Sequence, residues 1–206
     1  MTVVPGAISA VRASAIAEAG GLSLETLAED TDLTLALQRR NARIVYEPAA
    51  VAWTEAPETL RTLALQRFRW AYGTLQCLCK HRDLVFNRRY RAIAWFSLPS
   101  VWFFQIVLVA LTPAVDFFLL ASLPFGAWSA VLPFVIVFLA MDLLLAILAC
   151  ALEGEPLLHA WRILPMRLFY RPLLGYVIWK AIFRAIKGVW VSWGKLERTA
   201  SVPVRA

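Results

Sequence analysis

Three acidic residues, Glu29, Asp30 and Asp32, begin a stretch with helical spacing that covers residues 27–40. A carboxylate held where a loop meets a helix can accept the proton of a substrate hydroxyl, which contributes about 10²–10⁴-fold to a rate. The residues also have a structural interpretation, because acids in a first turn stabilise the helix dipole and Asp30 or Thr31 can cap the free N–H groups. Taken alone, the cluster favours capping over catalysis.

A second group of candidate residues lies in the sequence Gln66-Arg67-Phe68-Arg69-Trp70. Gln66, Arg69 and Trp70 are three and four residues apart, so they share one face of a helix. A guanidinium donates paired, charge-assisted hydrogen bonds to a diphosphate, and an indole packs on the apolar face of a sugar ring. The alternative, favoured without other information, is a helix anchored at a membrane surface by its Trp and Arg side chains.

The elements that carry these two groups differ in type. Residues 1–57 are typical of part of a soluble α/β domain, with strand-like runs at Arg43–Glu47 and Ala50–Thr54 that Pro48 divides. Residues 58–80 have the spacing of one amphipathic helix. Its apolar side comprises Leu60, Leu63, Ala64, Phe68, Ala71 and Leu75.

The rest of the chain has the composition of a membrane protein. Of the 206 residues, 60% are hydrophobic and 17% are charged, and the mean hydropathy is +0.63. The net charge of +7 is not spread as in a nucleic-acid groove, because no Lys or Arg occurs between Arg91 and Arg162. Basic residues flank an apolar centre, which predicts membrane topology and excludes a nucleic-acid partner.

Two apolar stretches, Val101–Leu120 and Ser129–Leu152, are long enough to cross a hydrocarbon core of about 30 Å. The short connection at residues 123–126 carries no charge, so we expect it outside and both termini in the cytoplasm. Prolines at 99 and 113 favour a kink or break in the first span, with residues 93–99 as a separate interfacial piece. The sequence thus divides into residues 1–57, an amphipathic interfacial helix with the Gln-x-x-Arg-Trp motif at 58–92, two transmembrane helices within 93–152, and a cytoplasmic or interfacial basic region 153–206.

Residues 173–191 have two interpretations. Lys180, Arg184 and Lys187 share one helical face, which favours a helix in the membrane interface over a third crossing. The membrane acids, Asp116 and Asp142, also have two interpretations, since each needs a partner away from lipid. A structural contact with another helix is favoured over the hydroxyls of a transported polymer.

The three cysteines, Cys77, Cys79 and Cys150, are too few for a disulfide framework, and we expect reduced thiols. Cys77, Cys79 and His81 match no common zinc spacing, so no metal site is predicted there.

Combined, the acidic cluster, the strand-like runs and Gln66-x-x-Arg69-Trp70 before two spans resemble processive family 2 glycosyltransferases. These are the membrane synthases of cellulose, hyaluronan, chitin and poly-N-acetylglucosamine. The matching stretches are residues 4–7, 20–21, 28–33, 46–48 and 66–70, and the tail Trp193–Thr199 is most similar to the poly-N-acetylglucosamine branch. The similarity covers nearly the whole chain, and the Gln-x-x-Arg-Trp signature is its most specific part.

The resemblance implies a fold and a set of roles. Residues 1–57 would be the C-terminal piece of an α/β domain of the GT-A type, within a mostly α membrane protein. Asp30 would be the catalytic base of an inverting transfer from a nucleotide sugar, and Glu29 would precede it in the substrate site, with Ala28 where the family motif has Thr. Gln66, Arg69 and Trp70 would bind the donor diphosphate and the acceptor sugar.

One part of the family pattern has no counterpart before Asp30. In the family, a Rossmann-like half with the acids that bind uridine and a divalent metal, Mg or Mn, precedes the acidic motif. The 29 residues before Asp30 are too few to build it. We therefore expect the metal ligands and donor site to come from a partner chain or a missing N-terminal half. The alternative function is a non-catalytic membrane subunit or a truncated remnant.

Overall fold

The computed structural model describes residues 3–47, 49–90, 92–126 and 128–188. The chain divides into two compact units, residues 1–107 with 177–206, and residues 108–176. The prediction of a mostly α protein is confirmed, because the ordered elements among the described residues are all helical. Residues 189–191 and the tail at 193–199 lie outside the described residues.

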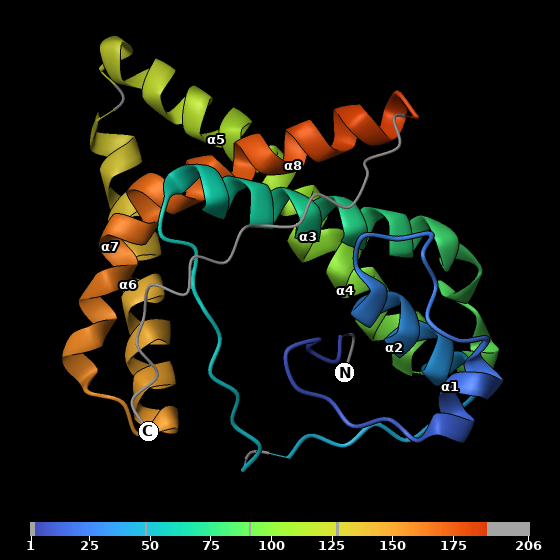
Figure 1. Cartoon of the computed structure of the whole chain (residues 1–206). Coiled ribbons are helices and arrows are strands. Elements are labelled where there is room, and N and C mark those ends of the chain that lie inside the picture. The colour runs from blue at the N-terminus through green and yellow to red at the C-terminus, as the bar shows by residue number, and fades with distance from the viewer. Residues whose placement is uncertain (1–2, 48, 91, 127, 189–206) are drawn as a thin grey trace. The chain divides into compact units, whose positions relative to one another are not determined.

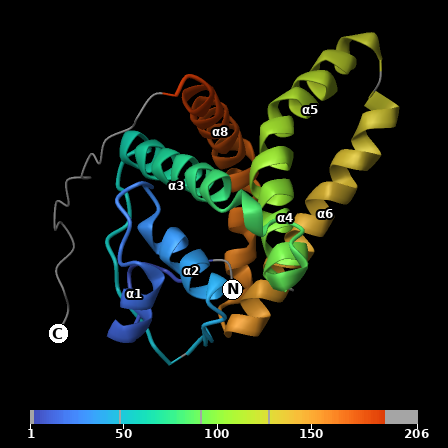
Figure 2. The ribbon, with the colours of Figure 1, turned by 90° about the vertical axis from the view of Figure 1, so that its right-hand side faces the viewer.

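Three helices form the first part of the first unit. They are α1 (Ala13–Ala19), α2 (Glu29–Arg39) and α3 (Leu60–Lys80). The start of α3 is fixed by a reciprocal capping box, in which Thr59 and Thr62 each accept a hydrogen bond from the other's backbone N–H. Both views show α2 lying beside the C-terminal half of α3 (Figures 1 and 2).

The predicted cap of α2 is wrong. Ala28 is the N-cap residue and makes no side-chain hydrogen bond, so Asp30 and Thr31 lie inside the first turn. Asp30 still accepts a hydrogen bond from the Thr31 N–H at 2.7 Å, which satisfies one free donor of that turn. The acids therefore contribute to helix stability through the dipole and this local bond.

The two predicted strands are also wrong. Residues 43–47 and 50–54 have no strand assignment, and the part of the chain described here contains no strand at all. Val45, Tyr46, Val51 and Trp53 are largely exposed, Trp53 to 97%. A strand requires the ladder hydrogen bonds of a neighbour, and high β-propensity alone does not supply them.

The predicted long helix is confirmed, but its apolar face is only partly buried. Phe68 and Leu75 are 5% and 6% exposed, whereas Leu60 in the first turn is 76% exposed. The core of this unit also contains residues from α2, from the end of α3, from η1 (Arg82–Leu84), from the start of the first apolar helix and from α8 (Arg171–Ile186): Leu35, Leu37, Leu78, Leu84, Ala94, Leu98, Val177, Ile178 and Ala181.

The first apolar helix is longer than predicted. It runs without interruption over Ile93–Phe125, through η3 (Ile93–Ser97), α4 (Leu98–Ser100), η4 (Val101–Val107), α5 (Leu108–Ser122) and η5 (Leu123–Phe125). The expected break and the separate interfacial piece are therefore wrong. Pro99 follows a π-helical turn and Pro113 lies inside α5, because wider turns accommodate a missing N–H without ending a helix.

The second unit contains the other apolar helix, α6 (Trp128–Glu153), of 26 residues. It is followed by η6 (Leu157–Arg162), α7 (Ile163–Pro165), η7 (Met166–Tyr170) and the start of α8 (Arg171–Ile186). Two helices, Ile93–Phe125 and α6, are long and apolar enough to cross a membrane. Their large apolar side chains are mostly exposed, as expected for surfaces that contact lipid.

Candidate functional site

Asp30 lies in the first turn of α2, with its carboxylate held on two sides. Its Oδ2 accepts a hydrogen bond from the Gly6 N–H at 3.2 Å, and its Oδ1 accepts from the Thr31 N–H at 2.7 Å. The side chain is half-buried. These two backbone donors fix the orientation of the carboxylate at the start of α2. Glu29 lies next to it, also half-buried.

The Gln66, Arg69 and Trp70 side chains come from the N-terminal half of α3. Trp70 is 54% exposed, and the Arg67 guanidinium lies 4.3 Å from the centre of its indole ring. The Gln66 Oε1 is buried, and among the described residues it has no hydrogen-bond partner. Phe68 points to the opposite side of the helix and is buried. The sequence motif thus presents an amide, a guanidinium and an indole on one side and a core residue on the other.

The same side of α3 continues to the contact with α2. Gly73, Gln76 and Lys80 follow Trp70 at intervals of three and four residues, so they lie on one stripe of the helix. A Cβ on Gly73 would lie 2.8 Å from the Cβ and backbone N of Ala28, which allows only glycine at this approach. One turn further, Gln76 Oε1 accepts a hydrogen bond from the Leu27 N–H at 2.9 Å.

The stripe therefore connects the two groups of candidate residues. Ala28 precedes Asp30 by two residues, and Gly73 lies one helical turn, about 5 Å, beyond Trp70. The charge of Asp30 also raises the pKa of Cys77 on α3, after the larger effect of burial, and that pKa reaches about 12. The two groups predicted to act together thus come from adjacent helices that meet at the Ala28–Gly73 contact.

A buried ionic network stabilises the region where α2 and α3 meet, which we call the α2–α3 junction, at the C-terminal end of α3. Asp32 is 2% exposed; its Oδ1 is bonded to His81 Nε2 at 2.6 Å, and its Oδ2 accepts from Lys80 Nζ at 2.8 Å. Lys80 also pairs with Glu25 at 2.8 Å. Burial alone would raise the pKa of Asp32, but the hydrogen bonds from His81 and Lys80 outweigh it and lower the pKa to about 2.

The tautomer of His81 follows from its other neighbour. Arg39 Nη2 lies 3.2 Å from His81 Nδ1 and also donates to Asp83 at 2.8 Å. A guanidinium has no acceptor, so Nδ1 is unprotonated and Nε2 carries the proton that is donated to Asp32. His81 therefore bridges both ends of α2 to the end of α3.

The sequence contains signals for His81, Cys77 and Gly73, but the sequence analysis did not assign these residues to the contact between α2 and α3. His81 was considered as a metal ligand with Cys77 and Cys79, but it binds Asp32. Cys77 is buried and its Sγ donates to the Ala28 carbonyl at 3.4 Å, so it is a neutral structural thiol. All three cysteines are free, as predicted. Gly73, inside a helix where glycine is unfavourable, marked the close approach.

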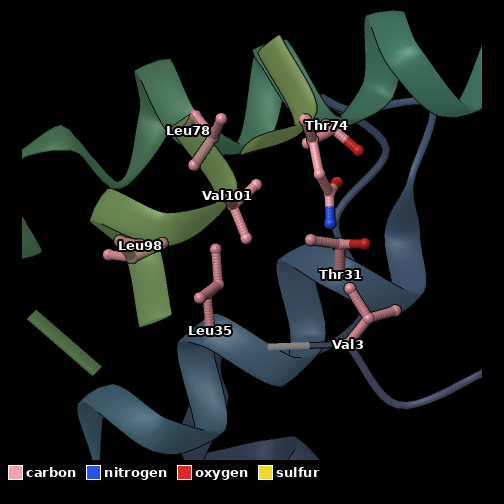
Figure 3. A pocket seen from close by; sticks show the side chains of 8 residues that line it. Val3, Thr31, Leu35, Thr74, Leu78, Leu98 and Val101 are labelled. Carbon is pink, nitrogen blue, oxygen red and sulfur yellow. The ribbon is translucent and has the colours of Figure 1, made fainter. Parts of the chain in front are cut away.

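A small cavity lies beside the junction, with a volume of about 20 Å³, enough for roughly one water molecule. In Figure 3, Leu35 of α2 points toward Val101 of η4 across this space, and Thr31 and Val3 close another side. A sugar ring is too large to enter this cavity. The full lining comprises Val3, Thr31, Leu35, Thr74, Leu78, Leu98, Val101 and Gln105.

In the second unit, both membrane acids have basic partners. Asp142 pairs with Arg167, and Asp116 pairs with Arg171 at 3.3 Å. These pairs bear out the favoured interpretation of a structural contact with another helix. The sequence analysis missed the two partners because they lie outside the predicted spans, four residues apart in η7 and α8.

The residues present do not form a metal site. Among the described residues, no group of three or more His, Cys, Asp or Glu side chains could hold a metal ion. Asp32, two residues after Asp30, has both oxygens engaged by His81 and Lys80.

Comparisons with known proteins show the family of this chain. The model of "Glycosyl transferase family group 2" matches residues 1–194. The chain belongs to this family. It is 30% identical over 146 residues to a probable glycosyltransferase, YdaM, of Bacillus subtilis, which covers 68% of this chain and 35% of that protein. No solved structure matches it.

A second relative indicates one branch of the family. The chain is 34% identical over 80 residues to poly-beta-1,6-N-acetyl-D-glucosamine synthase of Staphylococcus aureus, which covers 39% of this chain and 19% of that protein. The chain thus spans about a third of the length of the first relative and a fifth of the second. It is a family 2 glycosyltransferase chain that corresponds to part of its relatives.

Proposed function

We propose that this chain forms the acceptor-binding and membrane part of an inverting glycosyltransferase that extends a polysaccharide. The donor would be a nucleotide sugar of the UDP-N-acetylglucosamine class, by analogy with the Staphylococcus aureus relative. The observation that supports the proposal is the α2–α3 junction, where α2, which carries Asp30, meets α3, which carries Gln66, Arg69 and Trp70, at the Ala28–Gly73 contact.

In this proposal Asp30 acts as the general base. Its carboxylate accepts the proton of the acceptor hydroxyl while the hydroxyl oxygen bonds to the anomeric carbon of the donor. The bond between that carbon and the diphosphate oxygen breaks, and the nucleoside diphosphate leaves with the bonding electrons. Attack from the side opposite to the leaving group inverts the anomeric configuration.

The residues of α3 would bind the two substrates. Arg69 would neutralise the charge that develops on the departing diphosphate. The buried Gln66 Oε1 is an acceptor whose partner a sugar hydroxyl or N–H would supply. Trp70, which is 54% exposed, would stack on the acceptor sugar, and Glu29 would accept a hydrogen bond from a second hydroxyl.

The remainder of the proposal concerns the membrane and the donor. The helices Ile93–Phe125 and α6 would cross the cell membrane, with both termini of this multi-pass protein in the cytoplasm. Residues 1–57 would complete a GT-A-type domain together with a donor-binding half from a partner chain or a preceding segment. That half would also hold the divalent metal expected for the complete enzyme.

Incorporation of labelled sugar by membranes that contain the full-length gene product tests this function. With UDP-N-acetylglucosamine as donor, we expect polymer to form and one UDP to be released for each sugar added. Trp70→Ala should raise the KM for acceptor about tenfold or more, because base or sugar stacking on an aromatic ring is worth about 1 kcal/mol or more. Trp53→Ala is the matched control, since that indole is 97% exposed and lies outside the junction.

Two outcomes would contradict the proposal. One is UDP release without any growth of a saccharide, which would indicate donor hydrolysis alone. The other is an equal effect of the Trp70 and Trp53 substitutions on the KM, which would remove the stacking role.

A further inference from the structure

One buried hydroxyl of α2, that of Thr34, connects two segments of the chain around Asp30. Thr34 lies in the second turn of the helix and is 1% exposed. Its Oγ1 accepts a hydrogen bond from the Val4 N–H at 3.0 Å and donates one to the Asp30 backbone carbonyl at 2.7 Å. The bond to Asp30 is local to the helix, whereas the bond from Val4 joins residues 30 positions apart and is tertiary.

The tertiary bond to Val4 also controls where Gly6 lies. The Gly6 N–H donates to Asp30 Oδ2 at 3.2 Å. Pro5 lies between the two donors; its ring fixes its own φ at about −65° and restricts the residue before it to extended conformations. Few backbone torsions therefore remain free between the two N–H groups, so the bond at Thr34 sets the position of the bond at Asp30.

The Asp30 carboxylate needs the Gly6 donor to hold one orientation. The torsion about the Cβ–Cγ bond of an aspartate has broad energy wells, so it is poorly fixed by the side chain itself. The Thr31 N–H, 2.7 Å from Oδ1, belongs to the next residue and moves together with Asp30. The Gly6 N–H comes from a separate segment, so it holds the other oxygen relative to the rest of the first unit.

The two bonds around Thr34 should matter more for turnover than for stability. A general base has to come within about 2.6–3.2 Å of the proton it accepts, and a misplacement of about 1 Å can lower a rate about 10²-fold. The fold loses less, because Val4 is half-buried and Pro5 and Gly6 are exposed, so water can replace Thr34 as the partner of the Val4 N–H.

We propose that Thr34 is a positioning residue for Asp30: its hydroxyl holds residues 4–6 on α2 and thereby directs the Gly6 N–H to the carboxylate. This role of Thr34 rests on the proposed role of Asp30 as the base of the transfer reaction. It adds to the site a residue that acts through Asp30 and does not touch the substrate.

The test measures sugar incorporation by the full-length gene product in membranes, with kcat and the KM for acceptor determined separately. Thr34→Val nearly keeps the shape of the side chain and removes both hydrogen bonds, whereas Thr34→Ser keeps the hydroxyl that makes them. In Thr34→Val we expect kcat to fall about tenfold to hundredfold and the KM to stay within about twofold, because a displaced base affects the transition state and not acceptor binding. Thr34→Ser should restore kcat to within about threefold of the wild-type value.

Thr112→Val is the matched control. Thr112 Oγ1 donates to the Leu108 backbone carbonyl at 3.0 Å, which is the same bond between residues four apart that Thr34 makes within α2. The substitution removes this local bond from α5, in the second unit, and should leave kcat within about twofold of the wild-type value.

Val4→Pro removes the tertiary bond from the donor side and keeps the test decisive if Thr34→Val does not fold. Val4 already precedes a proline and is therefore extended, so a second proline fits at this position. We expect Val4→Pro to lower kcat by about the same factor as Thr34→Val. Hydrogen exchange of the Gly6 N–H should increase in both variants and keep its wild-type rate in Thr34→Ser and Thr112→Val.

An equal kcat in Thr34→Val and Thr34→Ser would overturn the positioning role of Thr34. A rise in the KM alone, or a loss of kcat in Thr112→Val as large as that in Thr34→Val, would overturn it as well. Asp30→Asn separates this failure from a failure of the proposed function. Full activity of Asp30→Asn would overturn both, whereas an inactive Asp30→Asn with fully active Thr34→Val and Val4→Pro would overturn only the role of Thr34.

Discussion

The α2–α3 junction and the second unit both pair carboxylates with basic side chains, but the surroundings of the pairs differ. At the junction, Asp32 is enclosed by protein and both its oxygens are satisfied by His81 and Lys80. In the second unit, Asp142 and Asp116 each have one arginine, on helices whose other side chains are apolar and exposed. The first arrangement fixes the geometry of the α2–α3 junction, and the second neutralises two acids on helices that are otherwise apolar.

This contrast implies different responses to substitution. A network with several partners loses one bond at a time, whereas a lone pair among apolar side chains leaves a full charge without a partner when one member is removed. A single substitution at the junction should therefore cost less than one in the pairs of the second unit, which should tolerate only joint replacement.

Arg167→Leu should have the largest effect on stability. It leaves the Asp142 carboxylate without its partner, at an expected cost of about 3 kcal/mol. The double variant Asp142→Leu with Arg167→Leu should recover most of that loss, because two apolar side chains replace the pair. Unfolding of both variants in mixed micelles measures this; a double variant as unstable as the single one would show that packing, and not charge, carries the contact.

Asp32→Asn should destabilise the first unit by about 2 kcal/mol near pH 7, since a pKa lowered from 3.8 to about 2 corresponds to that free energy. Because the pKa of Asp32 is lower in the folded state than in the unfolded state, the ionised carboxylate stabilises the fold at pH values above the unfolded-state pKa. This stability is lost as the pH falls from about 4 to about 2. The free energy of unfolding of the wild-type protein should fall over that pH range, and that of the variant should not. The same pH dependence in both proteins would contradict a stabilising role of the network.

Gly73→Ala tests the close approach of α3 to α2. Helix propensity alone predicts a gain of up to about 1 kcal/mol, but the added Cβ would meet Ala28 at 2.8 Å. Overpacking of this kind costs about 1–3 kcal/mol, so we expect a net loss of about 1 kcal/mol, measured by thermal unfolding. Stabilisation would mean that the helices do not meet here.

Thr59→Ala should have the smallest effect, about 1 kcal/mol, because it removes the capping box at the start of α3. Thr54→Ala, in an exposed segment without assigned structure, is the control. Hydrogen exchange of the first turn of α3 should increase only in the first variant. This end of α3 precedes Gln66 by two turns. An increase in hydrogen exchange at the α2–α3 junction as well would therefore indicate that α3 unfolds as a whole.

Much of the architecture could be predicted from the sequence because it depends on local patterns. The spacing of residues 58–80 located α3, and the absence of basic residues located both apolar helices. The two strands could not be predicted correctly, because a strand depends on a neighbour and β-propensity reports only the segment itself. The break predicted at Pro99 was wrong for a related reason, because the wider helical turns around it are not specified by any single residue.

The candidate site divides in the same way. Residue type and spacing singled out Asp30 and the Gln66, Arg69 and Trp70 face, and the family resemblance supplied their predicted roles. His81 was not assigned to Asp32, because residues 49 positions apart are brought together only by the packing of α3 on α2. Arg167 and Arg171 were missed because a partner for a membrane acid was sought within the spans alone.

The central claim is that Asp30 is the base of the transfer reaction, and one rate tests it most directly. The initial rate of sugar incorporation by the full-length gene product should fall about 10²–10⁴-fold in Asp30→Asn, which keeps an acceptor for the Gly6 N–H but cannot take a proton. Asp83→Asn, at an exposed surface pair, should leave the rate within about twofold, since such pairs contribute little. An Asp30→Asn rate equal to that of the control would contradict the assignment.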